Sequence, residues 1–386
     1  MSSARPRVLV LTYTRVDKSP RPLKQVGFLR ERFQLTTAGF GTTGVPGVEH
    51  IELPDQPLQR GGRAGRLLYF LLLLVRWHRP ISWLSARDSA VRRILGAREW
   101  DVVIAHDLWC LAAAVALRPS RGIVVDLHEY APAESEQSFV WRLLMRPYVK
   151  WLCRKVPSVA SRVITVSPGI AAEYKSVFGI DSVVVENFTP YVAHLTPGAV
   201  ARPIRLVHSG IAVPERRLEI LIDAVIGSRA DVTLDLYLVG NDEGYLGSLR
   251  KRAETDGRIR LHSPVPYREL ISTLNTFDVG LHVLPPTNFN LLHALPNKVF
   301  DYVQARLGLI VGPSPAMAGL VTDFQIGAVL PDYSPEALRH EIEGLEPHRV
   351  SQWKSSAQEA AFKLSSEQQS EVWVGLVDQV LAGKTD

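Results

Sequence analysis

The sequence has 386 residues, of which 46% are hydrophobic and 22% are charged, an ordinary composition for a soluble globular protein. This length exceeds one ordinary core and predicts two domains of roughly 150–200 residues each. The two cysteines, Cys110 and Cys153, lie far apart without a CxxC or Cys/His spacing, which excludes a disulfide framework and a zinc ribbon and favours a reducing cytosol.

The charge divides unevenly along the chain. Residues 1–190 contain 26 Lys and Arg against 16 Asp and Glu, whereas residues 191–386 contain 18 against 23. A basic first half favours a nucleic acid, an anionic membrane surface or an anionic acceptor as partner, with a solvated arginine-rich surface as the alternative. The amino terminus leads directly into an apolar run at residue 7, so we expect no signal peptide.

The first half alternates short apolar runs with helical patterns. Because the runs are almost wholly apolar, they indicate parallel strands covered on both faces, and their alternation with helices predicts a doubly wound α/β domain. The predicted strands span residues 7–13, 34–40, 48–53, 101–106, 122–128, 162–167 and 182–187.

The pattern restarts after a segment rich in Pro, Gly and small residues at 187–203. We therefore predict two Rossmann-like domains, 1–195 and 196–367, and a last helix within 368–386 that packs back on the first domain. Because ligands of open α/β sheets bind beyond the carboxyl ends of the strands, we expect the site in an interdomain cleft. The second set of predicted strands spans residues 204–210, 232–240, 258–263, 277–284, 307–312 and 327–331.

Two glycine-rich motifs do not carry a function by themselves. "GFGTTG" (39–44) matches the GxGxxG pattern, but no helix follows it, so it offers no helix start for a pyrophosphate. "QRGGRAGR" (59–66) resembles an RNA-binding tract, but a lone copy before a helix is more typical of a basic flank. We expect no nucleic acid as partner.

"LLYFLLLLVRW" (67–77) is too short to span a bilayer, which takes about 20 apolar residues. Its apolar body and basic rim fit a helix lying in an anionic membrane interface. A plain buried helix of the first domain is the alternative. The rim consists of Arg60, Arg63, Arg66, Arg76, Arg79 and Trp83.

Two predicted strands of the first domain end in acidic and imidazole groups. "AHDLW" (105–109) places His106 and Asp107 at one strand end, and "DLHEY" (126–130) places Asp126, His128 and Glu129 at the other. We expect a functional role for this pair of strand ends, with an ordinary hydrogen-bonded histidine as the alternative. Neither is a DxD pair, so we expect no metal-bound diphosphate.

In the second domain, "HSGIAVPERR" (208–217) predicts a strand, a glycine turn and a helix. Gly210 lets a ligand approach the backbone, and Arg216 beside a helix start makes an anion site, with two solvated arginines, Arg216 and Arg217, as the alternative. "YLVGND" (237–242) repeats the strand and glycine turn and places Asn241 near a base or a ribose.

"ALPNKVFDY" (294–302) predicts a helix that begins with Pro296 at its first position. The amides that follow, together with Asn297 and the Lys298 ammonium, form a cradle for a phosphate. Asp301 lies one turn later on the same face, where its carboxylate accepts hydrogen bonds from ribose hydroxyls. An exposed Lys–Asp pair is the alternative.

These motifs resemble a known family. "PNKVFDY" is similar to the PNKxFEY signature of bacterial family 4 glycosyltransferases, and "HDLW", "DLHEY", "VITVSPGIAAEY", "VVVENF", "YLVGN" and "IGAVLPDYSPEAL" extend the resemblance over nearly the whole chain. It implies the two-domain GT-B fold and retention of the anomeric configuration.

The resemblance also implies residue roles. Asp301 takes the place of a glutamate that binds the donor ribose, Arg216 contacts the diphosphate, and Lys298 and Asn297 lie at its end. His128 takes the place of the histidine near the reacting sugar, with Asp126 and Glu129 supporting its loop.

The chain departs from the family pattern at three places, the first of which is the absence of a Gly-Gly turn after the first strand, in "LTYTRVDKSPRP". His293 stands where a first glutamate is expected, with Asn290 as the other nearby polar group. Arg306 stands where a glycine is usual.

We therefore expect a retaining hexosyltransferase that works without a metal ion or other cofactor. Its donor is a UDP-sugar or GDP-sugar, and its acceptor is a cell-envelope glycan or a lipid-linked molecule. We place it in the cytoplasm, at the inner face of the plasma membrane if the basic domain contacts anionic lipid. A sugar-nucleotide epimerase or a phosphorylase of the same fold, and a non-catalytic nucleotide-sugar-binding subunit, remain as alternatives.

Overall fold

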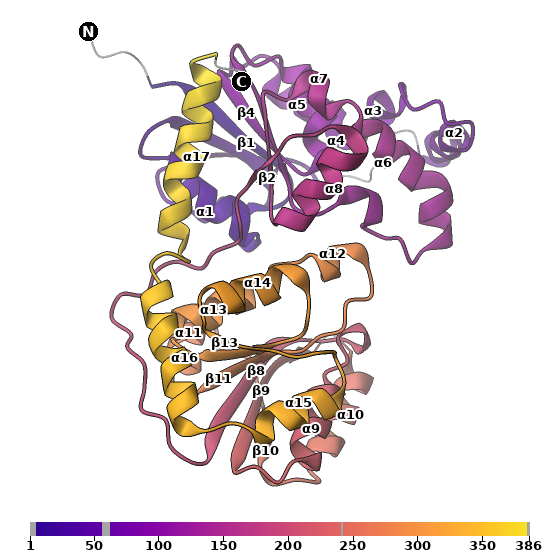
Figure 1. Cartoon of the computed structure of the whole chain (residues 1–386). Helices are drawn as coiled ribbons and strands as arrows, with labels where there is room; N and C mark the ends of the chain where they lie inside the picture. The colour runs from indigo at the N-terminus through magenta and orange to yellow at the C-terminus, as the bar shows by residue number, and fades with distance from the viewer. Residues whose placement is uncertain (1–4, 56–61, 241, 384–386) are drawn as a thin grey trace. The chain divides into compact units, whose positions relative to one another are not determined.

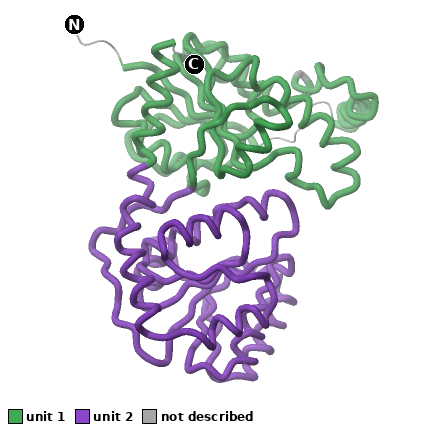
Figure 2. The backbone as a smooth tube through the Cα atoms, in the orientation of Figure 1, with its two compact units in different colours: residues 1–186, 369–386 green, residues 187–368 purple. Residues whose placement is uncertain are grey.

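The computed structural model describes residues 5–55, 62–240 and 242–383, which leaves Arg60 and Asn241 outside the described residues. The chain divides into two compact units, which are described separately (Figure 2). Unit 1 comprises Met1–Glu186 and Gln369–Asp386, and unit 2 comprises Asn187–Gln368. The division falls earlier in the chain than residue 195, because the segment after Glu186 packs with unit 2.

Unit 1 is built on a parallel sheet of seven strands in the order β3-β2-β1-β4-β5-β6-β7. Its central strands are buried on both faces, which is why their sequences are continuous apolar runs. All seven strands predicted in the first half are confirmed. They are β1 (Arg7–Arg15), β2 (Gln34–Phe40), β3 (Glu49–Glu52), β4 (Val102–His106), β5 (Gly122–Leu127), β6 (Arg162–Thr165) and β7 (Val183–Val184).

Helices cover the sheet of unit 1 (Figure 1). The carboxy-terminal helix α17 (Ser366–Leu381) begins in unit 2 and continues into unit 1, where Trp373 and Val377 pack in one core with Val8 of β1. After "GFGTTG" the chain continues into β3 without a helix. The other helical elements include α1 (Pro20–Leu29), α2 (Gly62–Leu74), α3 (Ile81–Leu84), α4 (Ala86–Leu95), α5 (Leu111–Leu117), η4 (Trp141–Met145), α6 (Arg146–Cys153), α7 (Val156–Val159) and α8 (Pro168–Phe178).

Unit 2 repeats the architecture with a parallel sheet of six strands in the order β10-β9-β8-β11-β12-β13. All six strands predicted in the second half are confirmed. They are β8 (Ile204–Ala212), β9 (Val232–Gly240), β10 (Ile259–His262), β11 (Val279–His282), β12 (Gly308–Val311) and β13 (Gly327–Val329).

Two apolar clusters form the core of unit 2, one on each face of the sheet. Helices α9 (Glu219–Gly227), α10 (Glu243–Ala253) and α15 (Pro335–Glu343) cover one face (Figure 1). The other face is covered by α11 (Tyr267–Leu274), α13 (Asn297–Gln304) and α14 (Pro315–Asp323), with α16 (Pro347–Ala360) at the edge. In each sheet the strand order reverses beside the first strand, at β1/β4 and at β8/β11, which is where open α/β sheets bind ligands.

Arg306, which stands where the resembled family has a glycine, has a structural role. Its backbone is left-handed, with φ of 59°, a conformation that glycine adopts without cost. Its fully buried guanidinium donates to the Gln304 and Val192 carbonyl oxygens at 2.6 and 2.8 Å. The arginine therefore accepts a strained backbone and ties the first segment of unit 2 to the end of α13.

Candidate functional site

In unit 1, the strand register explains why the two acidic and imidazole motifs meet. β4 and β5 are parallel neighbours, and His106 lies opposite Asp126 in the register. Because the carboxyl ends of both strands reach the same sheet edge, the residues that follow them, Asp107 and His128, lie there too.

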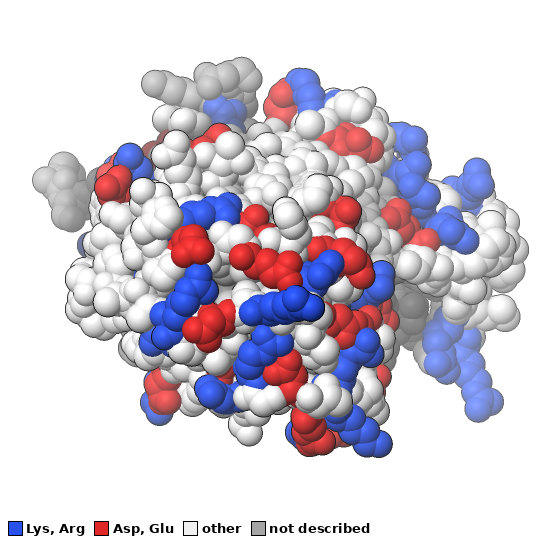
Figure 3. Space-filling model, turned by 60° about the horizontal axis from the view of Figure 1, so that its bottom comes forward, with Lys and Arg blue, Asp and Glu red and all other residues white. Residues whose placement is uncertain are grey.

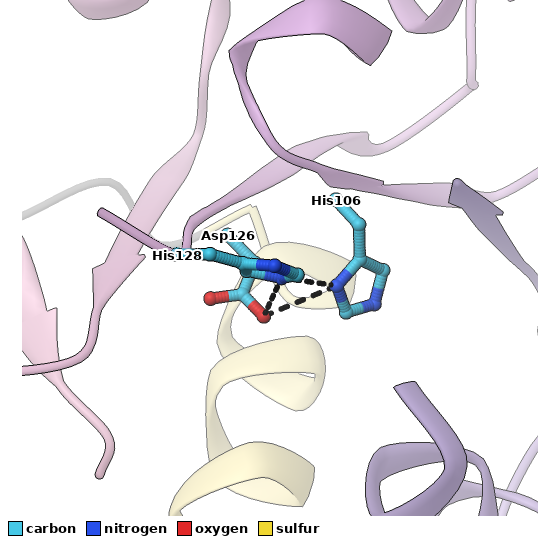
Figure 4. Close-up of side chains that lie close together, drawn as sticks. All are labelled: His106, Asp126 and His128. Atoms are coloured by element: carbon cyan, nitrogen blue, oxygen red, sulfur yellow. Dashed lines mark hydrogen bonds and ion pairs between the residues drawn. The ribbon is translucent and has the colours of Figure 1, made fainter. Parts of the chain in front are cut away.

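Asp126 is the centre of this cluster (Figure 4). It is fully buried, and its two oxygens accept hydrogen bonds of 2.7 Å from Nε and Nη2 of Arg21. Oδ2 also lies 3.3 Å from Nδ1 of His106 and 3.5 Å from Nε2 of His128. Burial opposes ionisation of Asp126, but Arg21 and His128 outweigh it and hold its pKa well below the usual range.

The two imidazoles have different protonation states. Nε2 of His106 lies 2.8 Å from the amide oxygen of Gln25, which only accepts, so Nε2 carries the proton and Nδ1 accepts from Nε2–H of His128 at 2.9 Å. Burial lowers the pKa of His106 to about 3, so this ring is neutral. Burial also opposes a charge on His128, but the carboxylates of Asp107 and Asp126 outweigh it and raise its pKa. His128 is thus the cationic member of the pair, and its Nδ1 lies 3.3 Å from Oδ2 of Asp107.

Asp107 and Glu129 flank the network. Asp107 has a φ of 65° and a ψ of 158°, a strained conformation for a residue other than glycine that costs about 1–3 kcal/mol. Burial, with the nearby carboxyls of Glu134 and Asp107, raises the pKa of Glu129 to about 7. The backbone carbonyl of Glu129 accepts a hydrogen bond from the Tyr174 hydroxyl at 2.9 Å, which fixes the loop after β5.

The donor atoms of His106, Asp126 and His128 lie within 4.8 Å of one another, close enough for one ion. However, both oxygens of Asp126 are already paired with Arg21, and the two rings are hydrogen-bonded to each other. The contacts are those of a proton-sharing network, and we assign no metal role to these residues.

In unit 2, a second group of residues surrounds Gly210 near the end of β8. A Cβ atom at Gly210 would lie 2.8 Å from Nε2 of His208, 3.5 Å from Cε of Lys298 and 3.6 Å from Nη1 of Arg216. Two cations and an imidazole therefore converge on a backbone position that has no side chain. Burial lowers the pKa values of both Lys298 and Arg216, which marks them as cations only partly solvated.

Two buried histidines lie beneath these cations. Nδ1 of His208 is 2.8 Å from the Leu281 carbonyl oxygen, so it carries the proton and Nε2 is left as an acceptor. His282, at the end of β11, is 6.3 Å away between ring centroids. Burial lowers the pKa of His208 to about 4 and that of His282 well below its usual range, so both rings are neutral. Nε2 of His208 and Nδ1 of His282 are buried without a hydrogen-bond partner.

The start of α13 differs from the predicted one in its first residue. Pro296 is the residue before the helix, with φ of −72° and ψ of 145°, and α13 begins at Asn297. The prediction of Pro296 at the first helical position is therefore wrong by one residue. The consequence for the cradle is small, because the amides of Asn297 and Lys298 still have no intrahelical acceptor at a helix start. Nζ of Lys298 lies 3.5 Å from the Ser209 hydroxyl on β8.

Asp301 is more buried than the predicted ribose contact suggests. Asp301 is only 2% exposed, and its Oδ1 accepts hydrogen bonds from the hydroxyls of Thr189 at 2.7 Å and Tyr267 at 3.3 Å. The alternative of an exposed Lys–Asp pair is wrong, because Asp301 is buried. The carboxylate ties α13 to α11 and to the segment after unit 1.

The remaining predicted donor residues lie close in sequence to this group. Asn290 is on the short helix α12 (Phe289–Leu292), and His293 follows that helix, half-buried, with its ring 4.4 Å from that of Phe289. Asn241 lies outside the described residues. Of the predicted donor-binding residues, the structure thus places Gly210, Arg216 and Lys298 next to one another.

Five residues of these two groups were not selected from the sequence: Arg21, Gln25, His208, Ser209 and His282. A usable signal existed for His208 and His282, since both lie near the carboxyl ends of the two strands at the switch point of their sheet. Arg21 and Gln25 carry no local signal, because their partners are 105 and 81 residues away in the chain.

Replacing Gly210 with alanine tests the cradle. The added methyl group would lie 2.8 Å from Nε2 of His208 and would crowd both cations, so we expect UDP affinity to fall at least tenfold, about 1.4 kcal/mol. Isothermal titration calorimetry measures this change. Gly247→Ala is the matched control, because a Cβ there on α10 meets no atom within 4 Å. Equal UDP affinity in both variants would exclude a ligand at Gly210.

Comparisons with known proteins agree with this architecture. Residues 42–190 match the model of Glycosyltransferase Family 4. A sequence search of curated proteins finds no match.

Solved structures match along the whole chain. HepE of Anabaena in complex with UDP gives a TM-score of 0.71 at 14% identity, covering 97% of this chain and 100% of that one. Sucrose-phosphate synthase of Thermosynechococcus elongatus gives 0.73 at 12% identity, covering 98% and 100%. A glycosyltransferase of Rickettsia africae gives 0.67 at 10% identity, covering 98% and 99%. At these identities the likeness shows the fold. Two parallel α/β units of this topology, together with the match over residues 42–190, identify the chain as a GT-B protein that resembles the family 4 glycosyltransferases.

Proposed function

We propose that this protein is a retaining glycosyltransferase that moves a hexosyl group from a UDP-sugar to a cell-envelope glycan or a lipid-linked acceptor. The observation that carries the proposal is the convergence of Lys298 and Arg216 on Gly210, beside the start of α13. A cluster of two cations and free helix amides favours a diphosphate. HepE, which shares the fold, has been solved with UDP and with UDP-glucose.

The proposed reaction needs no metal ion. The acceptor oxygen attacks C1 of the sugar from the face of the leaving group, the bond from C1 to the diphosphate oxygen breaks with its electron pair, and the acceptor proton passes to the phosphate. Lys298, Arg216 and the amides of α13 stabilise the charge that develops on UDP, a role that a metal ion plays in other enzymes. His208 and His282, being neutral, solvate the site without adding a fixed charge beside the cations.

We assign the acceptor to unit 1. The His128 imidazolium, held between Asp107 and Asp126, places a fixed positive charge at this sheet edge, beside the proposed acceptor. The basic surface of this unit is the proposed place of contact with an anionic membrane, at the inner face of the plasma membrane.

The test is a donor panel. UDP-sugars and GDP-sugars are incubated with the full chain, with and without EDTA, and release of the nucleotide and the anomeric configuration of the product are measured. Slow hydrolysis of a UDP-sugar that survives EDTA, with retained configuration, supports the proposal. Donor binding without hydrolysis or transfer would instead favour a non-catalytic binding subunit, and loss of activity with EDTA would exclude the metal-free mechanism.

The pH dependence of activity tests His128. Its pKa is raised, so the imidazolium persists to a higher pH than that of an ordinary histidine, and activity should fall as the pH rises through the His128 pKa. We expect His128→Gln to lower kcat about 100-fold and to abolish this alkaline limb. His348→Gln, on the exposed surface of α16, is the control. If the alkaline limb persists in His128→Gln, another group titrates.

A further inference from the structure

Helix α2 exposes an apolar surface. Tyr69, Leu72 and Leu73 are its buried residues, and the alternative of a plain buried helix is wrong because most of its other apolar side chains face solvent. Leu67, Leu68, Phe70, Leu71 and Leu74 are 46–63% exposed.

A second element extends this surface. The helical turn η4 packs against α2, and the Tyr69 hydroxyl donates to Sδ of Met145 at 3.7 Å. Phe139 before the turn is 68% exposed, and Val140 and Leu143 are also exposed. We call the set the apolar patch: Leu67, Leu68, Phe70, Leu71, Leu74, Val75, Trp77, Phe139, Val140 and Leu143. It holds ten of the twenty exposed large hydrophobic side chains among the described residues, a concentration that marks an interaction site.

The chain around the apolar patch carries charge of one sign. Residues 56–87 contain six arginines and no Asp or Glu, and residues 137–172 contain six Lys and Arg and no Asp or Glu. Figure 3 shows the end of unit 1 with α2, at the right, as an uncoloured surface bordered by blue side chains.

A basic pocket lies beside the apolar patch. Its volume is about 390 Å³, and it is lined by Arg76 after α2, Arg142 on η4, and Arg146, Lys150 and Arg154 on or after α6, with Trp151. None of these five cations forms an ion pair with a carboxylate in the described parts of the chain. Nε of Arg146 is buried without a partner. Five uncompensated cations around one hollow favour a phosphate group.

We propose that the apolar patch enters the interface of an anionic phospholipid bilayer and that the basic pocket takes a lipid phosphate. Charge complementarity selects this occupant, since an apolar helix face rimmed by arginines matches an anionic lipid surface. No helix among the described residues is long and apolar enough to cross a membrane, so the contact is peripheral. This membrane contact rests on the proposed function, whose acceptor is an envelope glycan or a lipid-linked molecule. It adds that unit 1 lies at the lipid surface.

Vesicle cosedimentation of the full chain tests this surface. We expect binding to phosphatidylcholine vesicles with 30% phosphatidylglycerol, at least tenfold weaker binding to phosphatidylcholine alone, and loss in 0.5 M NaCl. Arg142→Glu with Arg154→Glu should weaken binding at least 25-fold, because the loss of each cation alone accounts for about fivefold. Leu71→Ser with Leu74→Ser should abolish most of it.

Matched controls lie elsewhere on the surface. Val177→Ser on α8 and Arg250→Glu on α10 change exposed residues of the same types and should leave lipid binding unchanged. Equal binding by patch and control variants, or no binding to anionic vesicles, overturns the proposal. The proposal is also overturned if the protein forms a dimer without lipid and the double substitution Leu71→Ser and Leu74→Ser dissociates that dimer.

UDP affinity measured on the same proteins separates the two proposals. Retained UDP binding without lipid binding rejects only the membrane surface. Lipid binding without UDP binding rejects only the proposed transferase.

Discussion

Lys298→Ala is expected to lower kcat with the preferred UDP-sugar by about 100- to 1000-fold, or roughly 2.7–4 kcal/mol of transition-state stabilisation. The ammonium lies beside Gly210 and the Ser209 hydroxyl, where charge on the departing diphosphate would develop. Because this interaction strengthens as the bond breaks, kcat should fall more than UDP affinity. Steady-state kinetics and calorimetry on the same variant measure both.

The substitution should leave the fold intact. Neighbouring Val299 and Phe300 hold α13 in the core of unit 2, whereas the Lys298 ammonium makes one side-chain hydrogen bond within the described parts of the chain, to Ser209 at 3.5 Å. Lys251→Ala on the exposed surface of α10 removes the same charge from the same unit and serves as the control. If both variants keep the activity and UDP affinity of the native protein, the cradle does not bind the donor.

The strands and their order of appearance follow from local sequence alone. A strand buried on both faces needs an apolar residue at nearly every position, so each parallel strand can be recognised in the sequence as a short continuous run of apolar residues. The strand ends then place His106, Asp107, Asp126 and His128 at one sheet edge, which the sequence also predicts.

What the sequence does not show is which groups pair across long distances. The sequence pattern predicts that Asp301 is accessible to a ribose. In the structure its side chain is buried and accepts hydrogen bonds from Thr189 and Tyr267. Arg21 lies in an ordinary helix pattern, and only the folded chain brings it to Asp126. Pro296 illustrates a smaller limit, because proline has the same φ at the first helical position and just before it, and only ψ distinguishes them.

These distant pairings change the expected effect of mutations at the site. Removing Asp301 would break two hydrogen bonds that join α13 to its surroundings, so lost UDP binding in Asp301→Ala would not distinguish a ligand contact from a structural one. Lys298 is the cleaner probe, because its ammonium makes one side-chain hydrogen bond in the described parts of the chain, whereas a methyl group at Gly210 also crowds the buried His208 ring. The same reasoning applies to Asp126 in unit 1, whose replacement tests the stability of the unit and not catalysis.

Asp126→Asn is expected to destabilise unit 1 by about 3–5 kcal/mol, because it leaves the buried guanidinium of Arg21 without its compensating charge. For a unit of this size the midpoint of thermal unfolding should fall by roughly 10 °C. Calorimetry of the full chain measures it, and UDP, whose proposed site lies in unit 2, should help to assign the transitions by raising only that of unit 2. Asp378→Asn breaks the exposed pair with Arg32 in the same unit and should cost at most about 1 kcal/mol.

The pH dependence of stability gives a second test of the ion pair between Asp126 and Arg21. The folded pKa of Asp126 lies below the unfolded value of about 3.9, so its contribution to stability is fully present above pH 4 and is lost as the pH falls below it. The native protein should therefore lose stability in acid more steeply than Asp126→Asn, and the difference between the two should shrink as the pH is lowered. A difference that stays constant down to pH 3 would show that Asp126 stabilises unit 1 through packing and not through its charge.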